Sequence, residues 1–592
     1  MTSHRPELHG RFGMAASTHW LGTATAMSVL ERGGNAFDAA IACGFVLQIA
    51  EPHLCGPLGE MPAVVWSARD DSASVVCGQG IAPARATTDR FRSELGLDLV
   101  PGTGLLAATV PGAFGGWMLM LERWGTWRVR DVLEYVIGYA RRGVPAAPLL
   151  SAAINGVTDL FVRDWPTSAA IWLDGERPPN PFETVRQPRL AETYERLVRE
   201  AERAGSDRDQ QIRRAVDAWY RGFVAETIVE FCDARPWRDS SGREHGGLLS
   251  GDDLAGWSAT IEPPVTHDFG GYTVCKTGSW GQGPVFLQQL ALLDALGIDD
   301  VDYGSADFLH LSIEAAKLAF ADREAWYGDS NQIPDLVGHL LDRRYNLDRS
   351  RLVGDTASFE LRPGSIAGRQ PVVHSPTEGS ERSTIGAGEP TLGSDGTVSG
   401  DTCHVDVVDR WGNMVSATPS GGWLQSSPAI PELGFCLGTR AQMFVLADGH
   451  PNSLRPGARP RTTLTPTLAL RDGQQWMAFG TPGGDQQDQW SVAFFLAVVL
   501  GGLDLQAAID APAFTSYHFP SSFYPRDDRP GHLAMESRFD TRVIDALRQR
   551  GHIIDTVGPW ALGRLSAVAR DPEGNLRGAA NSRGALGYAA GR

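Results

Sequence analysis

The ten residues from Gly400 to Asp409 read GDTCHVDVVD, and the interpretation of the whole chain starts from them. A small polar residue precedes Thr402, and the alternating pattern that follows predicts a β-strand ending at the turn DRWGN. A hydroxyl nucleophile needs a base, and a threonine at a chain start carries one in its own α-amino group. Two interpretations stay open from these residues alone: an ordinary strand entering a hairpin, or a nucleophile released by cleavage before Thr402.

The regions on either side of this stretch differ in character. Residues 352–400 are rich in Gly, Ser, Pro and Thr, which predicts a long flexible loop whose end would make a cleavage site reachable. Helices and strands are expected on both sides, which favours a layered α+β sandwich with one shared core. The expected helices are 24–31 (with Thr23 as N-cap), 36–50, 117–124, 132–139, 200–215, 308–326, 489–500 and 541–550. The expected strands are 63–66, 74–76, 405–408, 414–417, 463–470, 476–479, 565–570 and 576–580.

Composition and charge exclude several classes of protein. The chain has 592 residues, of which 42% are hydrophobic, and a formal net charge of −17, which argues against nucleic-acid binding. Seven cysteines without a Cys-x-x-Cys pair argue against a disulfide framework or a zinc site. The histidines show no ligand spacing, so we expect no metal and no cofactor. The N-terminus lacks a secretory signal and the longest apolar run, 492–500, is too short to span a bilayer, so we expect a cytoplasmic protein without membrane contact.

Two further segments carry candidate chemistry. Residues 480–485 read GTPGGD between an expected strand and an expected helix, and successive glycines at a helix start expose backbone N–H groups that can hold an oxyanion. The same residues also fit a plain strand-to-helix turn. Residues 459–467 read RPRTTLTPT and could line a pocket or form a structural loop. No phosphate loop, His-Glu-x-x-His helix, Gly-x-Ser-x-Gly elbow or Rossmann fingerprint is present.

Taken together, these pieces resemble the γ-glutamyltransferase family of N-terminal-nucleophile hydrolases, in order along most of the chain. The matching segments are GGNAFDAA at 33–40, EPH at 51–53, VPG at 110–112, the helix segment 314–323, GD at 328–329, TCH at 402–404, the hairpin 409–416, TT at 462–463 and PGG at 482–484.

The resemblance implies a precursor that cleaves itself between Asp401 and Thr402. The products would be a large subunit, 1–401, with a flexible linker over about 352–401, and a small subunit, 402–592. They would stay associated in a four-layer αββα sandwich. The Thr402 hydroxyl would attack a carbonyl, its amine would carry the proton, and the N–H groups of Gly483 and Gly484 would stabilise the oxyanion. Thr418 corresponds to a family threonine near the nucleophile's amine, and His404 is expected to be structural.

The chain departs from the family where the family binds glutamate. Gln79 replaces the arginine that holds the substrate α-carboxylate, and Met443 replaces the aspartate that holds the α-ammonium. Arg440 replaces a nearby glutamine and Gly422 an asparagine, whereas Thr462 and Thr463 stand at the paired serines. A carboxylate without its arginine loses a charge-assisted pair, and methionine accepts an ammonium poorly. Arg440 could hold a carboxylate placed differently, or pair with a protein acid.

These changes predict a hydrolase for a small carboxylate-bearing, non-glutamyl substrate, cleaved at an amide or an activated C–C bond. Family relatives with a changed glutamyl site include cephalosporin acylases, an oxamate amidohydrolase and hydrolases of antibiotic pathways, so a role in natural-product metabolism is one expectation. A γ-glutamyl hydrolase or transferase with a rebuilt pocket, and a non-catalytic scaffold of the same fold, are the alternatives. The sequence leaves the oligomeric state open, with a homodimer as one alternative.

Overall fold

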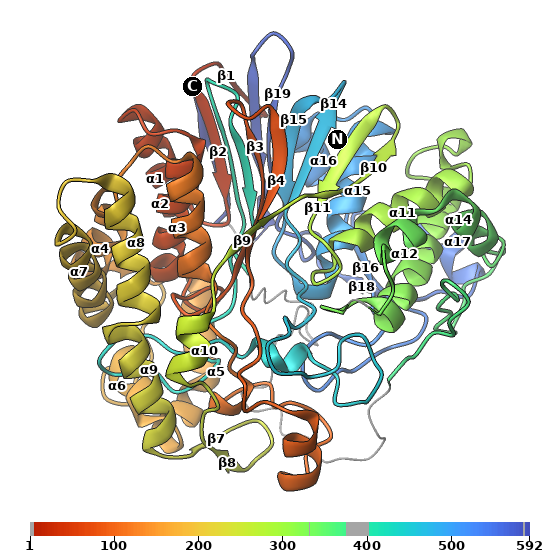
Figure 1. Cartoon of the computed structure of the whole chain (residues 1–592). Coiled ribbons are helices and arrows are strands. Elements are labelled where there is room, and N and C mark those ends of the chain that lie inside the picture. The colour runs from red at the N-terminus through yellow and green to blue at the C-terminus, as the bar shows by residue number, and fades with distance from the viewer. Residues whose placement is uncertain (1–4, 331, 375–401, 584–585) are drawn as a thin grey trace.

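Two antiparallel sheets of seven strands lie face to face at the centre of the protein (Figure 1). The computed structural model describes residues 5–330, 332–374, 402–583 and 586–592. The first sheet has, in spatial order, the strands β21 (Tyr588–Gly591), β2 (Gly13–Ser17), β12 (Val405–Asp409), β13 (Met414–Ala417), β3 (Met61–Ser67), β4 (Ser72–Gly78) and β9 (Thr260–Glu262). The second has β1 (Leu8–Gly10), β20 (Leu576–Ala580), β19 (Ser566–Arg570), β15 (Gln474–Gly480), β14 (Thr467–Arg471), β11 (Tyr272–Lys276) and β10 (Val265–Phe269).

Apolar side chains from both sheets fill the space between them. Met14, Val64 and Val408 from the first sheet belong to the same buried cluster as Leu468 and Val568 from the second. Strands that present apolar side chains to this interface and also carry helices on their other face are buried on both sides. That explains why every residue of β2, β3 and β12 is buried, the two aspartates of β12 included.

Helices cover the outer face of each sheet (Figure 1). The helices on the side of the first sheet are α1 (Trp20–Glu31), α2 (Ala36–Ala50), α3 (Ala113–Trp124), α4 (Val129–Arg142), α5 (Pro148–Arg163), α6 (Pro166–Trp172), α7 (Pro188–Glu202), α8 (Arg208–Tyr220), α9 (Phe223–Ala234) and α10 (Gly251–Gly256). Those on the side of the second are α11 (Gly283–Ala295), α12 (Ala306–Trp326), α13 (Leu336–Leu341), α14 (Arg343–Ser350), α15 (Gln487–Val499), α16 (Leu505–Asp510) and α17 (Thr541–Gln549). The expected α+β class and four-layer αββα sandwich are thereby confirmed.

Short elements complete the fold. They are the three-stranded sheet β16 (Phe514–Ser516), β17 (His532–Glu536) and β18 (Ile553–Val557), the pairs β5 (Val144–Pro145) with β6 (Thr184–Val185) and β7 (Trp237–Arg238) with β8 (Glu244–His245), the π-helix η1 (Arg90–Glu94), and the 3₁₀ helices η2 (Leu105–Ala107), η3 (Ile298–Asp300), η4 (Arg440–Met443) and η5 (Gly484–Gln486). Within the described part of the chain, no helix combines the length and the apolar character needed to cross a bilayer.

The first helix begins earlier than the sequence predicts. Its N-cap is His19, whose Nδ1 accepts a hydrogen bond from Leu21 N at 3.1 Å. Thr23 was expected to be the N-cap, but its hydroxyl lies 2.8 Å from Ser17 Oγ and donates to Tyr588 O. The assignment of Thr23 was therefore wrong, because tertiary partners use its side chain.

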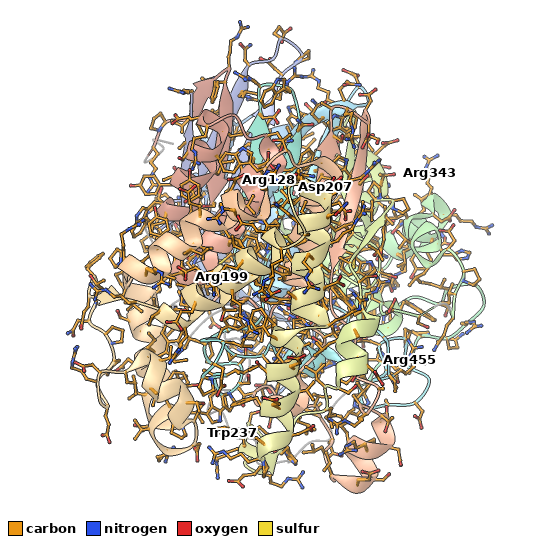
Figure 2. All side chains as sticks on the ribbon, turned by 60° about the vertical axis from the view of Figure 1, so that its left-hand side comes forward. Arg128, Arg199, Asp207, Trp237, Arg343 and Arg455 are labelled. Carbon is orange, nitrogen blue, oxygen red and sulfur yellow. The ribbon has the colours of Figure 1, made fainter. Side chains whose placement is uncertain are left out.

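The charged stretch 200–215 is two helices and not one. α7 ends at Glu202, Gly205 adopts a φ of +91°, and α8 begins after Asp207, which accepts a hydrogen bond from Gln210 N. Figure 2 turns this helical layer forward and labels Arg199 in α7 and Asp207 before α8. The positive φ of Gly205 explains the break, because every residue inside a right-handed α-helix has a negative φ.

The predicted linker is described only in part. Residues 352–374 contain neither helix nor strand, as expected. Asp401 and the rest of the linker from residue 375 lie outside the described residues, so the position of the subunit boundary stays a prediction.

Candidate active site

The register of the β12–β13 hairpin determines what faces Thr402. Val405 pairs with Ala417 in this hairpin, and the same antiparallel register continues beyond the strands to a bridge between Thr402 and Ser420. The two hydroxyl oxygens lie 3.4 Å apart, and both side chains are buried. A second hydroxyl group therefore stands beside the candidate nucleophile.

Two residues further into the hairpin, His404 lies opposite Thr418. His404 Nδ1 lies 3.0 Å from Thr418 Oγ1, and His404 Nε2 lies 3.0 Å from Asp406 Oδ1. The histidine ring fills the space above Gly480, where a Cβ atom would lie 2.3 Å from it. Thr418 thus contacts the histidine that joins the two sheets, and its expected role near the Thr402 amine stays a prediction.

Ser420 is connected to a buried ion pair. Arg440 donates from Nη2 to Ser420 Oγ at 2.9 Å and from Nε to Glu60 Oε2 at 3.1 Å. Both charged side chains are fully buried, where an ion pair interacts strongly but an unpaired charge is very unfavourable. Of the two expectations for Arg440, pairing with a protein acid is the arrangement seen. The arginine is also linked to Thr402 through Ser420, which contacts both residues.

Met443 lies in an apolar cluster next to this ion pair. Its side chain packs with Trp423 and Phe523, and its sulfur lies 3.8 Å from Arg440 Nη1. The Arg440 guanidinium also lies over the Trp423 ring at 5.2 Å. This wall offers aromatic and thioether surfaces, and Met443 brings no carboxylate that could hold a substrate ammonium.

The glycine pair forms a turn between β15 and α15. Gly483 has a φ of +128°, and a Cβ atom on it would lie 2.3 Å from the Trp490 ring. Gly484 has a φ of +54° and opens η5. Among the described residues, neither N–H group of this pair donates a hydrogen bond, so both are available to an oxyanion.

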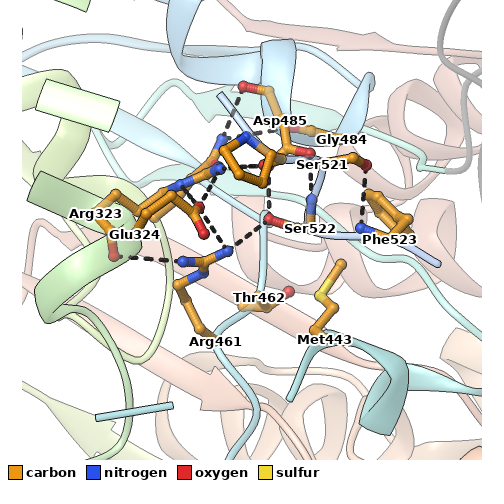
Figure 3. A network of polar contacts seen from close by, with 12 residues as sticks. Arg323, Glu324, Met443, Arg461, Thr462, Gly484, Asp485, Ser521, Ser522 and Phe523 are labelled. Atoms are coloured by element: carbon orange, nitrogen blue, oxygen red, sulfur yellow. Dashed lines mark hydrogen bonds and ion pairs between the residues drawn. The ribbon is translucent and has the colours of Figure 1, made fainter. Parts of the chain in front are cut away.

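Buried carboxylates on the C-terminal side fix this turn. Asp485 accepts hydrogen bonds from Ser522 N at 2.8 Å and Ser522 Oγ at 2.6 Å, and forms an ion pair with Arg323 (Figure 3). In the first turn of α15, Asp488 lies 3.1 Å from Lys276 Nζ. Burial raises the pKa of Asp488 and lowers that of Lys276, while their mutual attraction opposes both changes. The glycine N–H groups therefore sit on a rigid support.

The other predicted binding residues are buried but make few polar contacts. Gln79 follows β4, and among the described residues its Oε1 accepts no hydrogen bond. Thr462 N donates to Trp280 O at 2.9 Å, whereas Thr463 Oγ1 has no hydrogen-bond partner in the described chain. Gly422, with a φ of +62°, packs its backbone against Gly56. The structure thus links Thr402 to Arg440 through Ser420, and Arg440 to Met443 directly. Gln79 and Thr463 offer polar atoms without partners among the described residues.

A second buried polar group lies behind the residue after Thr402. Cys403 Sγ is 3.4 Å from Glu51 Oε2, which accepts a hydrogen bond from Thr18 Oγ1 at 2.6 Å. Burial raises the pKa of Glu51 and of the Cys403 thiol. Burial also lowers the pKa of the nearby His53 to about 3, with a smaller contribution from Arg564. Burial around the start of β12 thus disfavours the charged form of each of these three groups.

One cluster has the composition of a metal site. The ligand atoms of His310, Glu314 and His552 lie within 4.8 Å of one another. Glu314 already forms ion pairs with Lys317 at 2.7 Å and Arg362 at 3.2 Å, and His310 Nδ1 is 2.9 Å from His552 Nε2. Two cations therefore already neutralise the only carboxylate of the cluster, which makes it a poor site for a divalent ion.

Comparison with known proteins decides the family. A sequence model described as Gamma-glutamyltranspeptidase matches residues 22–591. The chain belongs to this family. As a member of the gamma-glutamyltranspeptidase family it is a hydrolase of the N-terminal-nucleophile type.

Relatives within the family carry different names. The chain is 29% identical to the acylase ACY 1 proenzyme of Pseudomonas sp. (strain SE83), over 98% of this chain and 93% of that one. It is 27% identical to the glutathione hydrolase proenzyme of Bacillus subtilis (strain 168), over 97% and 90%. Among solved structures, LmbA2991HD matches over the full length of both chains with 54% identity and a TM-score of 0.93. The cephalosporin acylase from Bacillus halodurans matches with 26% identity and a TM-score of 0.82, over 100% of this chain and 97% of that one.

Two site residues escaped the sequence analysis. Ser420 could have been found from the hairpin alone, because Trp411 is the centre of its turn and residues 402 and 420 are equally far from it. Glu60 offers no such signal, because it meets Arg440 across 380 positions of the chain. Only the folded arrangement of η4 against the segment before β3 brings that pair together.

Proposed function

We propose that this member of the family is a self-processing hydrolase whose nucleophile is Thr402. Cleavage between Asp401 and Thr402 gives subunits 1–401 and 402–592 that remain one particle. Relatives along nearly the whole chain are named proenzymes, which supports a precursor. The new α-amino group of Thr402 then serves as the base, since such groups titrate near pH 8.

The observation that carries the proposal is the pair of buried hydroxyl groups, Thr402 Oγ1 and Ser420 Oγ, 3.4 Å apart. Arg440 can only donate, so its hydrogen bond occupies an acceptor site of Ser420 Oγ. The Ser420 hydroxyl is thereby oriented by a charged group that is itself fixed by Glu60. Ser420 therefore acts as a positioning residue for the nucleophile.

The reaction follows from these positions. The Thr402 oxygen attacks the substrate carbonyl while its proton passes to the Thr402 amine. Charge develops on the carbonyl oxygen, and the donors that receive it are the N–H groups of Gly483 and Gly484, which have no acceptor within the described chain. When the intermediate collapses, the ammonium returns the proton to the leaving group. Water then hydrolyses the Thr402 ester with the same amine as base.

The substrate we propose is small, bears a carboxylate and is not a γ-glutamyl compound. Met443 lies in an aromatic cluster where an ammonium would need an acid, and the fork of Arg440 is occupied by Glu60 and Ser420. An oxamate amidohydrolase proenzyme of Klebsiella pneumoniae is 29% identical over 97% of this chain and 98% of that one, so the family includes a hydrolase named for a small non-glutamyl acid. The bond broken is an amide or an activated C–C bond, in a compound of specialised metabolism.

Self-cleavage is tested by denaturing electrophoresis and N-terminal sequencing. The purified protein is expected to give two bands, the smaller one beginning at Thr402. Thr402→Ala should remain a single uncut chain, whereas Thr402→Ser should still be cut because it keeps a hydroxyl. Normal cleavage of Thr402→Ala, or a new N-terminus elsewhere, would overturn the proposal.

Substrate class is tested with matched anilides on the processed protein. We expect glutaryl-p-nitroanilide or succinyl-p-nitroanilide to be hydrolysed faster than γ-glutamyl-p-nitroanilide, which differs from the glutaryl compound only by its α-ammonium. Preferential release of glutamate from the γ-glutamyl compound would instead support the alternative of a γ-glutamyl hydrolase or transferase with a rebuilt pocket.

A further inference from the structure

Arg526 is a buried arginine that uses almost none of its hydrogen-bonding capacity. The residue is 4% exposed, and within the described chain its guanidinium makes one hydrogen bond, from Nη2 to the carbonyl oxygen of Met443 at 3.3 Å. Nε has no acceptor, and no carboxylate of a described residue forms an ion pair with it. Buried arginines are otherwise almost always paired, because desolvation of the charge is unfavourable.

The neighbouring arginines show the normal arrangement. Arg323 and Arg461 form ion pairs with Glu324, and Arg323 also binds Asp485 (Figure 3). With Arg526, this buried region holds three guanidinium groups and two carboxylates. Burial and the charge of Arg323 lower the pKa of Arg526, against the attraction of Glu324 and Asp485. Among the described residues the region therefore has an excess of positive charge, and Arg526 is the arginine without a carboxylate partner.

Its backbone shows that this placement is specific. Arg526 has a φ of +68°, a region that L-residues other than Asn and Asp rarely adopt and that raises the free energy by about 1 kcal/mol or more. Arg526 N donates to Phe523 O at 2.7 Å, which closes the turn. A strained turn thus holds a poorly paired cation inside the protein.

The turn is attached to both sides of the candidate active site. Phe523 packs on Met443 and Trp423, which line the wall next to Arg440. Ser522 binds Asp485, the residue after Gly484. The carbonyl that Arg526 holds belongs to Met443, whose sulfur lies 3.8 Å from Arg440. The Arg526 guanidinium is therefore supported by the same loops that support the Arg440 wall and the glycine turn.

We propose that Arg526 is the anion subsite of this enzyme and binds the carboxylate of the substrate through its unpaired guanidinium edge. The inference rests on the proposed function, because it assigns the residue that recognises the carboxylate there. A planar guanidinium with a free edge matches a carboxylate with two parallel hydrogen bonds. The bound carboxylate gives the Arg526 guanidinium a negatively charged partner, which it lacks among the described residues of the free enzyme. This new ion pair is the source of the affinity.

The chemistry of the other arginines favours this assignment. Arg440 already binds Glu60 and Ser420, and Arg461 binds Glu324 and Ser522. A carboxylate at either one would have to displace an existing buried partner. Arg526 requires no such displacement, and the backbone carbonyl of Met443 leaves most of its donors open.

Calorimetric titration with dicarboxylates tests the subsite without turnover. Oxalate, succinate and glutarate are titrated into the processed wild-type protein, into Arg526→Met, and into Arg529→Met. Arg529 is the matched control, because it lies three residues away, is exposed, and pairs with Asp555 at 3.0 Å. We expect at least one dicarboxylate to bind the wild type and Arg529→Met equally, and Arg526→Met at least tenfold more weakly.

A second variant distinguishes loss of the anion subsite from misfolding of Arg526→Met. Arg526→Lys keeps the charge without the planar fork, so it should bind the same dicarboxylate with intermediate affinity and raise KM more than it lowers kcat. Unchanged dicarboxylate affinity in Arg526→Met or Arg526→Lys, or no binding to the wild type, would overturn the subsite. A failure of the proposed function would appear separately, as an uncut chain on the denaturing gel.

Discussion

Side chains at the start of β12 combine two hydroxyl groups, one guanidinium and one carboxylate in a single line of contacts. Thr402 faces Ser420, Ser420 accepts from Arg440, and Arg440 pairs with Glu60. Each member restricts the next, because Arg440 can only donate and Glu60 can only accept when ionised. The proposed nucleophile is thus positioned by Ser420, which Arg440 and Glu60 hold in turn.

Replacement of Ser420 should therefore slow the reaction without unfolding the protein. Ser420→Ala removes one charge-supported hydrogen bond, which corresponds to a roughly 10–100-fold lower kcat/KM. Ser420→Thr keeps the hydroxyl and should retain most activity. Ser427→Ala is the control, because it removes an equally buried hydroxyl that donates to Leu437 O. Wild-type kinetics in Ser420→Ala would contradict the role of Ser420.

The buried histidines predict a loss of stability in acid. The pKa of His53 is lowered to about 3, mainly by burial, from about 6.5 in the unfolded chain. Below pH 6.5 the unfolded state therefore binds a proton that the folded state does not, and stability falls as the pH falls towards 3. One such histidine contributes a slope of up to about 1.4 kcal/mol per pH unit.

His53→Leu isolates this contribution. Both ring nitrogens of His53 lack hydrogen-bond partners in the described structure, so the substitution should change the midpoint of urea unfolding little at pH 7.5. Between pH 6.5 and 4.5 the variant should lose stability less steeply than the wild type. Equal slopes for the two proteins would show that His53 is not the titrating group.

At the level of helices and strands, the sequence predicts features that depend on neighbouring residues, but it does not predict contacts between residues far apart in the chain. The β12–β13 hairpin, α2 and the strand before the glycine pair were predicted because each depends on neighbouring residues. The same local symmetry of the hairpin would have placed Ser420. Glu60 and Arg526 were missed because their side chains contact residues far away in the sequence, 380 positions for Glu60 and Arg440 and 83 for Arg526 and Met443. Hydrophobic periodicity does not indicate such contacts.

The glycine turn gives a prediction at this scale. Gly483→Ala places a methyl group against Trp490 at a φ of +128°, so the turn must move and its N–H groups lose their orientation. Loss of one oxyanion donor lowers kcat by about 10²–10³-fold. Gly473→Ala is the matched control: its φ is +76°, but nothing lies near its added methyl group. It should cost some stability and leave kcat unchanged, whereas equal kcat in both variants would exclude the turn from catalysis.

At the scale of the whole molecule, the two proposed subunits are interleaved in both sheets. In the first sheet β12 and β13 from the second half of the chain lie between β2 and β3 from the first half (Figure 1). In the second sheet β14 and β20 pair with β11 and β1. Neither half has a complete sheet or a complete core, so cleavage before Thr402 should leave the native particle unchanged.

Size-exclusion chromatography after cleavage checks this expectation. The processed protein and uncut Thr402→Ala should elute at the same volume, although only the former gives two bands under denaturing conditions. Residues 1–401 and 402–592 expressed alone should be insoluble or unfolded by circular dichroism. A folded, monomeric 402–592 fragment would contradict a core that both halves share.

Because the two sheets are interleaved, the protein should refold differently before and after cleavage of the chain. In the precursor, β12 closes on β2 within one chain, and the entropy of that step does not depend on concentration. After cleavage the same step is a bimolecular association of two incomplete halves. Unfolding and refolding would then follow different routes, with hysteresis that deepens on dilution. Once separated and unfolded, the two chains of the cleaved protein would not readily refold together into the native structure.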